Sequence, residues 1–446
     1  MVTKRLSFVK NPQSSEIILG LLPSSCKPFR ESAQHLQKNI KQFRPVLSIF
    51  LAGKKIYFLQ PECCKSVTLS EKVSVFAACF LSFAVFELSV FEYLVAPVAM
   101  AVLTANRVTY SPALTLVPTY ECFNRCQYCN FRVNPEADEW MSLQTAEARL
   151  QQAQSLGVIE ILILTGEVHP QSPRRLAWLQ RIYDLCDLAI SMGFLPHTNA
   201  GPLSSTEMVQ LKQVNVSMGL MIEQMTPDLL TGVHRYAPSK RPDIRQQQLE
   251  QAGQLKIPFT TGLLLGIGES IADRIESLQA IAACHDRWGH IQEVILQPHQ
   301  PGISQAEPRC SFSAEELATF VTTARHYLPP EITLQIPPNL VGSKSDLLAA
   351  IANGARDLGG LGPLDEVNPT YFHPTVNTLE ACLQPAGWEL RPRLPVYPQY
   401  DDWLPMRLRD LVTQWRDTLM NHSVTPKSLS DYLTLQPNVE SVGATP

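Results

Sequence analysis

Three closely spaced cysteines constrain this chain more than any other feature of its sequence. Cys122, Cys126 and Cys129 follow the spacing CxxxCxxC. Thiolates are soft ligands that select zinc, copper(I) or iron-sulfur clusters. A structural zinc site is closed by four ligands, and the next His and Cys, His169 and Cys186, belong to later predicted elements. The loop is therefore incomplete as a zinc site, whereas a cubane cluster on three cysteines leaves one iron open for a small molecule.

Charge is divided unevenly along the chain. Residues 1–99 contain 12 Lys and Arg against 6 Asp and Glu, and the remainder contains 25 against 35. An acidic body argues against nucleic acid as the substrate, because phosphate binding requires a basic surface. The 11 cysteines show no regular disulfide spacing. We therefore expect a reducing compartment and a cytoplasmic protein.

Residues 1–99 are predicted to be an N-terminal extension that need not belong to the functional enzyme. They end in an apolar run, residues 73–105, which Glu87 and Glu92 interrupt. A spanning helix needs about 20 mostly apolar residues, and an acidic residue near its centre costs roughly 2.5 to 3.5 kcal/mol. The uninterrupted part is too short. A membrane-associated helix through residues 73–105 is the main alternative, and any membrane association would depend on this run.

From Ala113 onward, short β-rich runs alternate with longer amphipathic stretches, which is typical of βα units around a parallel sheet. The predicted strands are residues 113–121, 159–165, 195–199, 216–222, 259–267, 291–297, 333–336 and a weaker eighth within 358–367. The predicted helices are residues 142–156, 174–192, one opened by Ser204 and Ser205, 243–256, 271–287, 313–327, 344–356 and 378–386. Eight units predict an α/β fold, a (β/α)8 TIM-type barrel over residues 108–390, with an open three-quarter barrel as the alternative. Residues 391–446 are predicted to be a closing segment and a polar tail.

Polar and glycine residues follow several of these strands, and ligands of a parallel barrel gather at the carboxyl ends of the strands. The candidates for ligand binding are Gly166 and Glu167 after the second strand, Asn199 at the end of the third, Ser217 and Glu223 around the fourth, and Gly266 and Gly268 after the fifth. Glycines let a ligand approach the backbone closely. A glycine-softened strand and turn is the less favoured alternative for the last pair, whereas for Ser217 and Glu223 a turn or surface role is an equal alternative. Further polar residues in predicted loops are His169, His197, His234, Arg235, Tyr236, His299 and Asp365. Each of these alone is more often structural than catalytic, so no general base can be chosen.

The cysteine loop, with the aromatic Tyr128 just before its last cysteine, resembles the cluster loop of the radical S-adenosylmethionine (SAM) superfamily. This resemblance implies a [4Fe-4S] cluster held by Cys122, Cys126 and Cys129. It implies further that the amino and carboxylate groups of SAM chelate the open iron, and that one electron from the cluster releases a 5'-deoxyadenosyl radical. Tyr128 is then expected to contact the cofactor.

Two further motifs fit the superfamily. Thr165-Gly166-Glu167 is similar to its GGE motif, with Thr165 in place of the first glycine, which implies that Glu167 holds the ammonium of SAM. The stretch from Gly262 to Glu269 is similar to its GxIxGxxE pattern, with Leu264 at the Ile position. This second likeness implies that Gly266 and Gly268 lie close to the adenine and ribose of SAM.

Longer segments resemble one family within this superfamily. They are TYECFNRCQYCNFR (119–132), LTGEVHP (164–170), HTNAGPL (197–203), HRYAPSKRPDIR (234–245), QAGQLKIPFTTGLLLGIGE (251–269), HIQEVILQ (290–297), DLGGLGPLDEVNP (357–369) and RLPVYP (393–398). Together they are similar to the CofG-type component (subunit 1) of 7,8-didemethyl-8-hydroxy-5-deazariboflavin (FO) synthase.

That resemblance implies a lyase of deazaflavin coenzyme biosynthesis. Its substrate would be the 5-amino-5-(4-hydroxybenzyl)-6-(D-ribitylimino)-5,6-dihydrouracil adduct, which a sister radical SAM component of the CofH type makes from tyrosine and a ribitylaminouracil. Hydrogen abstraction, ring closure, ammonia release and oxidation would complete FO, with ferredoxin or flavodoxin as the electron donor.

Three alternatives to this assignment stay open at the level of sequence. The first is another radical SAM enzyme: the sister deazaflavin component, a tyrosine lyase or a hydrogenase-maturation enzyme. The second is a membrane-tethered iron-sulfur electron carrier, which predicts a four-ligand cluster and no SAM site. The third is a zinc-binding scaffold, which iron and sulfide content would exclude.

Overall fold

The computed structural model describes residues 49–52, 55–58, 106–302, 305 and 311–421. The chain divides into two compact units, Met1–Val95 and Ala96–Pro446. In the first unit, β1 (Ile49–Ala52) and β2 (Lys55–Phe58) form an antiparallel pair. The predicted apolar run 73–105 and the polar tail after residue 421 lie outside the described residues. Within the described residues, no helix is long and apolar enough to cross a membrane.

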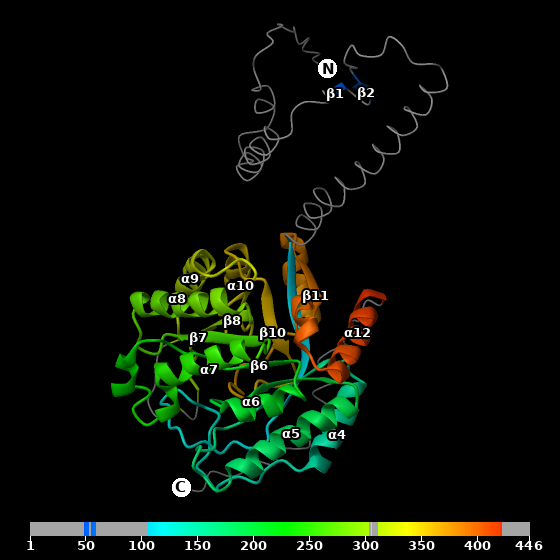
Figure 1. The fold of residues 1–446 in the computed structure, drawn as a ribbon. Coiled ribbons are helices and arrows are strands. Elements are labelled where there is room, and N and C mark those ends of the chain that lie inside the picture. Colours follow the sequence, from blue (N-terminus) through cyan, green and yellow to red (C-terminus); the bar gives the residue numbers. More distant parts are fainter. Residues whose placement is uncertain (1–48, 53–54, 59–105, 303–304, 306–310, 422–446) are drawn as a thin grey trace, which may run out of the picture. The chain divides into compact units, whose positions relative to one another are not determined.

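In the described part of the second unit, parallel strands form a closed barrel with helices packed around its outside (Figure 1). The sheet follows chain order from its first strand to its eighth, and the eighth pairs back to the first. These strands are β3 (Arg107–Leu116), β4 (Glu160–Leu164), β5 (Leu195–Asn199), β6 (Ser217–Gly219), β7 (Phe259–Leu265), β8 (Ile291–Pro298), β9 (Thr333–Gln335) and β10 (Asp357–Leu361). The predicted (β/α)8 barrel is confirmed, and it is closed rather than open.

Serine and threonine side chains begin most of the barrel helices by accepting a hydrogen bond from the first turn. Ser204 and Ser270 each form a capping box, with Glu207 and Asp273 respectively. The helices are α4 (Leu143–Gln154), α5 (Arg175–Ser191), α6 (Ser205–Lys212), α7 (Pro242–Gln254), α8 (Ile271–Trp288), α9 (Ala314–Tyr327), α10 (Lys344–Ala352) and α11 (Val376–Leu383). Their buried apolar residues face the strands and make one continuous core.

Several elements differ from the predicted ones, and three of the differences are informative. The first strand begins at Arg107 and ends at Leu116, because the predicted continuation to residue 121 leaves the sheet to form the cysteine loop. Strand β6 is only three residues long. Beyond it the chain stays beside β7, where Glu223 forms an isolated bridge with Leu263 and has a left-handed φ of 64°. Helix α12 (Met406–Asn421) is a described helix that the predicted closing segment and tail did not include.

The segment after β11 (Glu389–Pro392) covers the end of the barrel at which the strands begin. Strand β11 pairs with the first half of β3. The carbonyl oxygen of Pro395 then accepts hydrogen bonds from Ser217 Oγ, at 2.6 Å, and from Gln292 Nε2, at 2.9 Å. The hydroxyl of Tyr397 donates to Glu293 Oε1 at 3.0 Å. Among the described residues, this end of the barrel is therefore covered by the closing segment, and the strand ends that carry the cysteine loop lie at the opposite end.

Candidate functional site

Two adjoining cavities occupy the barrel at and below the carboxyl ends of its strands. The outer cavity, of about 230 Å³, is lined by Cys122, Cys126, Cys129, Gly166, Glu167, Glu223, Lys240, Arg245 and His299, among others. The inner cavity, of about 200 Å³, is lined by Glu160, His197, Glu293, Asn339, Asp365, His373 and Arg393, among others. Residues lining both cavities are Leu164, Asn199, Leu220, Met221, Gln297, Val367 and Asn368. The two cavities therefore adjoin at these residues.

The three predicted cluster cysteines are free thiols, partly buried, on the wall of the outer cavity. The loop that carries them is held close to the next strand, since a Cβ on Gly166 would stand 2.1 Å from the carbonyl oxygen of Glu121. Two N–H groups point at the sulfurs: the Phe131 amide lies 3.4 Å from Cys129 Sγ, and Asn124 Nδ2 lies 3.7 Å from Cys122 Sγ. Hydrogen bonds to ligating sulfurs tune the potential of iron-sulfur clusters.

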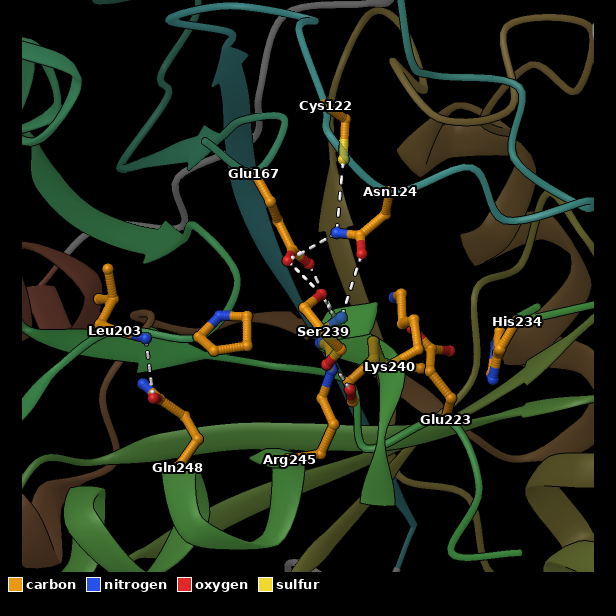
Figure 2. Close-up of polar contacts among 12 residues, drawn as sticks. Cys122, Asn124, Glu167, Leu203, Glu223, His234, Ser239, Lys240, Arg245 and Gln248 are labelled. Carbon is orange, nitrogen blue, oxygen red and sulfur yellow. Dashed lines mark hydrogen bonds and ion pairs between the residues drawn. The ribbon is translucent and has the colours of Figure 1, made fainter. Parts of the chain in front are cut away.

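Glu167 is at the centre of a buried hydrogen-bond network beside the cysteines (Figure 2). Its carboxylate accepts from Asn124 Nδ2 and Arg245 Nη2, each at 2.9 Å, and from the hydroxyl of Ser239. Burial raises the pKa of the Glu167 carboxyl, but Arg245 and Lys240 more than offset it, so the pKa lies below its usual range. A carboxylate accepts about four hydrogen bonds, so an ionised Glu167 retains room for one more donor.

A second ion pair stands beside the first. Lys240 Nζ lies 2.5 Å from Glu223 Oε1, and both side chains are largely buried. Glu223 reaches this position from a left-handed backbone conformation, which costs a non-glycine residue of order 1 kcal/mol and is concentrated at functional sites. The pair therefore adds one cation and one anion to the wall of the outer cavity.

The other predicted cofactor contacts divide into two groups. Tyr128 lines the outer cavity, where its hydroxyl lies 3.0 Å from His234 Nε2, and Asn199 lies at the junction of the two cavities. Ser217 lies elsewhere, because its hydroxyl binds His197 Nδ1 and the closing segment at the opposite end of the barrel.

Gly266 and Gly268 also lie outside the residues that line the outer cavity. Both have left-handed φ angles, of 90° and 120°. Their amides and that of Ile267 donate to the carboxylate of Glu269, at 2.7 to 3.1 Å. The glycine motif therefore forms a tight turn around its own glutamate after β7.

The remaining polar candidates occupy several places. His299 lines the outer cavity, and His197 and Asp365 line the inner one. Burial, followed by nearby cations, lowers the pKa of His197 and of His234 to about 3, so both rings are neutral near pH 7. The exposed residues of this group are His169, Arg235 and Tyr236.

Sequence reasoning missed the partners of Glu167 and Glu223. Asn124 is inside the cysteine loop, Ser239 and Lys240 come from the stretch that joins β6 to α7, and Arg245 is in the first turns of α7. The signal available in the sequence was that residues 119–132 and 234–245 are among the segments resembling the FO synthase family. Single polar side chains leave no periodic pattern, so their roles depend on the fold.

Comparison with known proteins gives this geometry a family. The model of the radical SAM superfamily matches residues 116–281. A 7,8-didemethyl-8-hydroxy-5-deazariboflavin synthase of Nostoc sp. is 61% identical over 312 residues, 70% of this chain and 92% of that protein. The synthases of Synechococcus elongatus and Gloeobacter violaceus are 60% and 55% identical and are covered over 94% and 98% of their lengths. The chain belongs to the FO synthase family of the radical SAM superfamily.

Solved structures agree with this fold. HydG, a maturase of the FeFe-hydrogenase, superposes with a TM-score of 0.56 at 14% identity over 70% of each chain. Methylornithine synthase (PylB) superposes with a TM-score of 0.52 at 14% identity, covering 66% of this chain and 86% of that one. At these identities, the likeness concerns the fold alone.

As a member of this family, the chain is an enzyme that uses a [4Fe-4S] cluster and SAM. The donor set fits such a cluster. Within the described residues, no group of three or more His, Cys, Asp or Glu is placed to hold a single metal ion. In a cubane each thiolate binds a different iron, so three thiols spread around one cavity suit a cluster better than one ion. Burial raises the pKa of Cys126 to about 12, and iron is the partner that ionises such a thiol.

Proposed function

We propose that this chain makes 7,8-didemethyl-8-hydroxy-5-deazariboflavin from the tyrosine-derived ribitylaminouracil adduct, closing the third ring with release of ammonia. The reaction is that of an ammonia-releasing lyase. The observation that carries the proposal is that three free thiols and Glu167 share one cavity, which adjoins a second cavity inside the barrel. The high identity to named FO synthases over nearly their whole length supports the same activity.

In this proposal, the residues that line the outer cavity have distinct roles. Cys122, Cys126 and Cys129 hold the cluster, and the free lone pair of Glu167 accepts from the ammonium of SAM. Tyr128 and Asn199 contact the cofactor from the loop and from β5. When bound, the cluster and SAM supply the bond cleavage that starts hydrogen abstraction from the substrate.

The barrel itself positions the substrate and excludes water. The closing segment blocks one end, so reactants enter and leave at the cysteine loop. The apolar side chains of Leu164, Leu220 and Met221 lie where the cavities meet. A reacting carbon held there is close to the cofactor and away from stray hydrogen donors.

The partners in this proposal are small molecules and redox proteins. A sister radical SAM component supplies the adduct, and a ferredoxin or flavodoxin supplies electrons. The acidic enzyme body does not suit nucleic acid. The cysteines of the described residues are free thiols, which supports a reducing cytoplasmic compartment.

The test is an anaerobic assay of the reconstituted protein with SAM, a reductant and the adduct made by the sister enzyme. Deazaflavin fluorescence and 5'-deoxyadenosine are both measured, for the native chain and for Cys126→Ala. We expect both products from the native chain and loss of both in the variant. Cys284→Ala, which removes a buried thiol far from the loop in sequence, is the matched control and should retain both.

The other outcomes separate the alternatives. Formation of 5'-deoxyadenosine without deazaflavin, with an active sister enzyme present, would contradict the substrate and leave another radical SAM reaction. A stable cluster that never cleaves SAM would favour an electron carrier. Equal activity in native protein and Cys126→Ala would exclude the cysteine loop as the cluster site.

A further inference from the structure

The inner cavity contains more polar groups than the barrel needs for its own closure. Toward its base, Arg393 lies 2.6 Å from Asp357 and 2.5 Å from Glu293, which holds the closing segment. Toward its top, a separate set of polar residues comes from the loops that follow β9 and β10: Asn339, Asp365, Asn368 and His373. This upper set lies on the side of the cavity that faces the outer cavity, since Asn368 lines both.

The orientation of Asn339 is fixed by its neighbours. Its Nδ2 donates to Asp365 Oδ2 at 2.8 Å and to the carbonyl oxygen of Tyr371 at 3.0 Å. Asp365 is itself held by the amides of Val367 and Asn368, each at 2.9 Å. Because both amide hydrogens of Asn339 are used, its carbonyl Oδ1 is the free end of the side chain.

Two buried polar atoms of this set have no hydrogen-bond partner among the described residues: Asn339 Oδ1 and His373 Nδ1. Burial lowers the pKa of His373 despite the nearby Asp365, so its ring is neutral and offers one donor and one acceptor nitrogen. A buried polar atom without a partner is destabilising. A ligand group able both to donate and to accept would satisfy both atoms.

The charge of the cavity restricts which ligand this can be. Four carboxyl residues line the inner cavity, Glu160, Glu293, Asp365 and Glu366, against the single guanidinium of Arg393, which is already paired. A phosphate or carboxylate would be repelled. Hydroxyl groups are uncharged and match carboxylates, amide carbonyls and imidazole nitrogens alike.

We propose that the inner cavity binds the unphosphorylated ribityl chain of the substrate, with Asn339 and His373 as specificity-determining contacts. The inference rests on the proposed function, because a deazariboflavin carries a ribityl chain that its precursor must bring. With the chain directed toward the base, the ring system lies against Leu164, Leu220 and Met221, at the junction with the outer cavity. The polyol thus positions the reacting carbon.

The test measures binding of the product to the reconstituted holoenzyme by fluorescence anisotropy under anaerobic conditions. Three probes are compared: the deazariboflavin, its analogue with a methyl group in place of the ribityl chain, and its 5'-phosphate. We expect the ribityl chain to improve the Kd about a hundredfold over the methyl analogue, and the phosphate to weaken it at least about tenfold. Equal affinity for the first two probes, or tighter binding of the phosphate, would overturn the inference.

Variants then locate the contacts. Asn339→Leu and His373→Phe should each reduce the preference for the ribityl chain about tenfold, while the Kd of the methyl analogue changes little. Asn353→Leu is the matched control, an exposed asparagine at the end of α10, and should keep the native preference. A ratio of two Kd values within one protein is insensitive to partial misfolding, so an unchanged ratio in both variants contradicts the assignment.

Failure of the proposed function looks different. The same native preparation is assayed for deazaflavin formation from the adduct. If deazaflavin forms but the ribityl chain adds no affinity, only the assignment of the inner cavity is contradicted. If no deazaflavin forms with an active sister enzyme, the proposed function is contradicted, and so is the assignment of the inner cavity to the ribityl chain.

Discussion

The two ends of the barrel both bury charged groups, but in different proportions. At the mouth, each carboxylate has a cation of its own: Arg245 for Glu167 and Lys240 for Glu223. At the base, one guanidinium is shared. Arg393 contacts Glu293 and Asp357 and lowers the pKa of Glu160, which burial raises more strongly.

This difference follows from what each end must bind. The paired groups of the mouth line the outer cavity, so their unused lone pairs and protons are available to a ligand. The base network instead binds the closing segment to β8 and β10 through Glu293 and Asp357. Glu160 of β4 is near enough for Arg393 to oppose the rise that burial causes in its pKa. Buried charge at the mouth is therefore expected to control ligand binding, and buried charge at the base to control stability.

Arg393→Met tests whether the buried charges at the base of the barrel control stability. This change leaves up to three buried carboxyls without their cation, and loss of one partner of a buried pair typically costs about 3 to 5 kcal/mol. We expect denaturant unfolding to show a destabilisation of this size. Arg416→Met is the matched control: Arg416 binds Asp401 in the same region but is partly exposed, so its loss should cost about 1 kcal/mol or less. Equal losses in the two variants would contradict the proposed role of the base.

The contrast between the two ends also explains what the sequence could predict. The barrel follows from local patterns: the apolar run of residues 159–165 predicts β4 to within one residue at each end, and Ser142 and Ser204 begin α4 and α6 as predicted. The cysteine loop is equally local. These features depend on residues close together in the chain, so they can be predicted without a structure.

The ion-pair networks at the two ends of the barrel could not be predicted in this way, because they join residues far apart in the sequence. Arg245 reaches Glu167 across 78 positions, and Arg393 reaches Asp357 across 36. Ser217 is a candidate because of its place on the fourth predicted strand, and Gly266 and Gly268 are candidates because residues 262–269 are similar to the superfamily's GxIxGxxE pattern. Which end of the barrel Ser217 faces, and whether the glycine amides point to a ligand or to Glu269, depends on three-dimensional geometry. Helix α12 was missed because its only apolar stripe lies among many charged residues.

A second experiment tests whether the Lys240–Glu223 pair at the mouth controls SAM binding rather than stability. The double variant Lys240→Met with Glu223→Gln removes a buried pair as a unit, which is often neutral for stability. We expect the free energy of unfolding to change by less than about 1 kcal/mol, while the Kd for SAM, measured by equilibrium dialysis on the reconstituted protein, rises about tenfold. The double variant Arg241→Met with Asp243→Asn removes an exposed pair at the start of α7, close in sequence to Lys240, and should change neither quantity. Unaltered SAM binding in the first variant would show that this pair is structural.

A weaker effect is expected in the pH dependence of the free energy of unfolding, through Glu293 at the base of the barrel. Burial raises the pKa of Glu293 to about 7, and Asp357 and Glu160 add to the effect although Arg393 opposes it. One cation cannot neutralise three carboxylates, so the folded state keeps a proton that the unfolded chain loses above its ordinary pKa of about 4.5. Stability from this group is therefore complete below about pH 4.5 and is lost as the pH rises to about 7, with a slope of at most about 1.4 kcal/mol per pH unit.

This slope is isolated by comparing the native chain with Glu293→Gln between pH 5 and pH 7.5. Buried neutral histidines such as His197 change stability in the opposite direction, so the informative quantity is the difference between the two unfolding curves at each pH. We expect the native chain to lose stability relative to Glu293→Gln as the pH rises, with no further change above about pH 7. Glu389→Gln is the control. It removes an exposed carboxyl at the same end of the barrel, and the bond to Arg391 lowers the pKa of that carboxyl. The unfolding curves of the native chain and of Glu389→Gln should therefore stay parallel between pH 5 and pH 7.5. Parallel curves for native protein and Glu293→Gln would mean that Arg393 holds Glu293 ionised, and the base would then resemble the mouth, with each cation committed to one carboxylate.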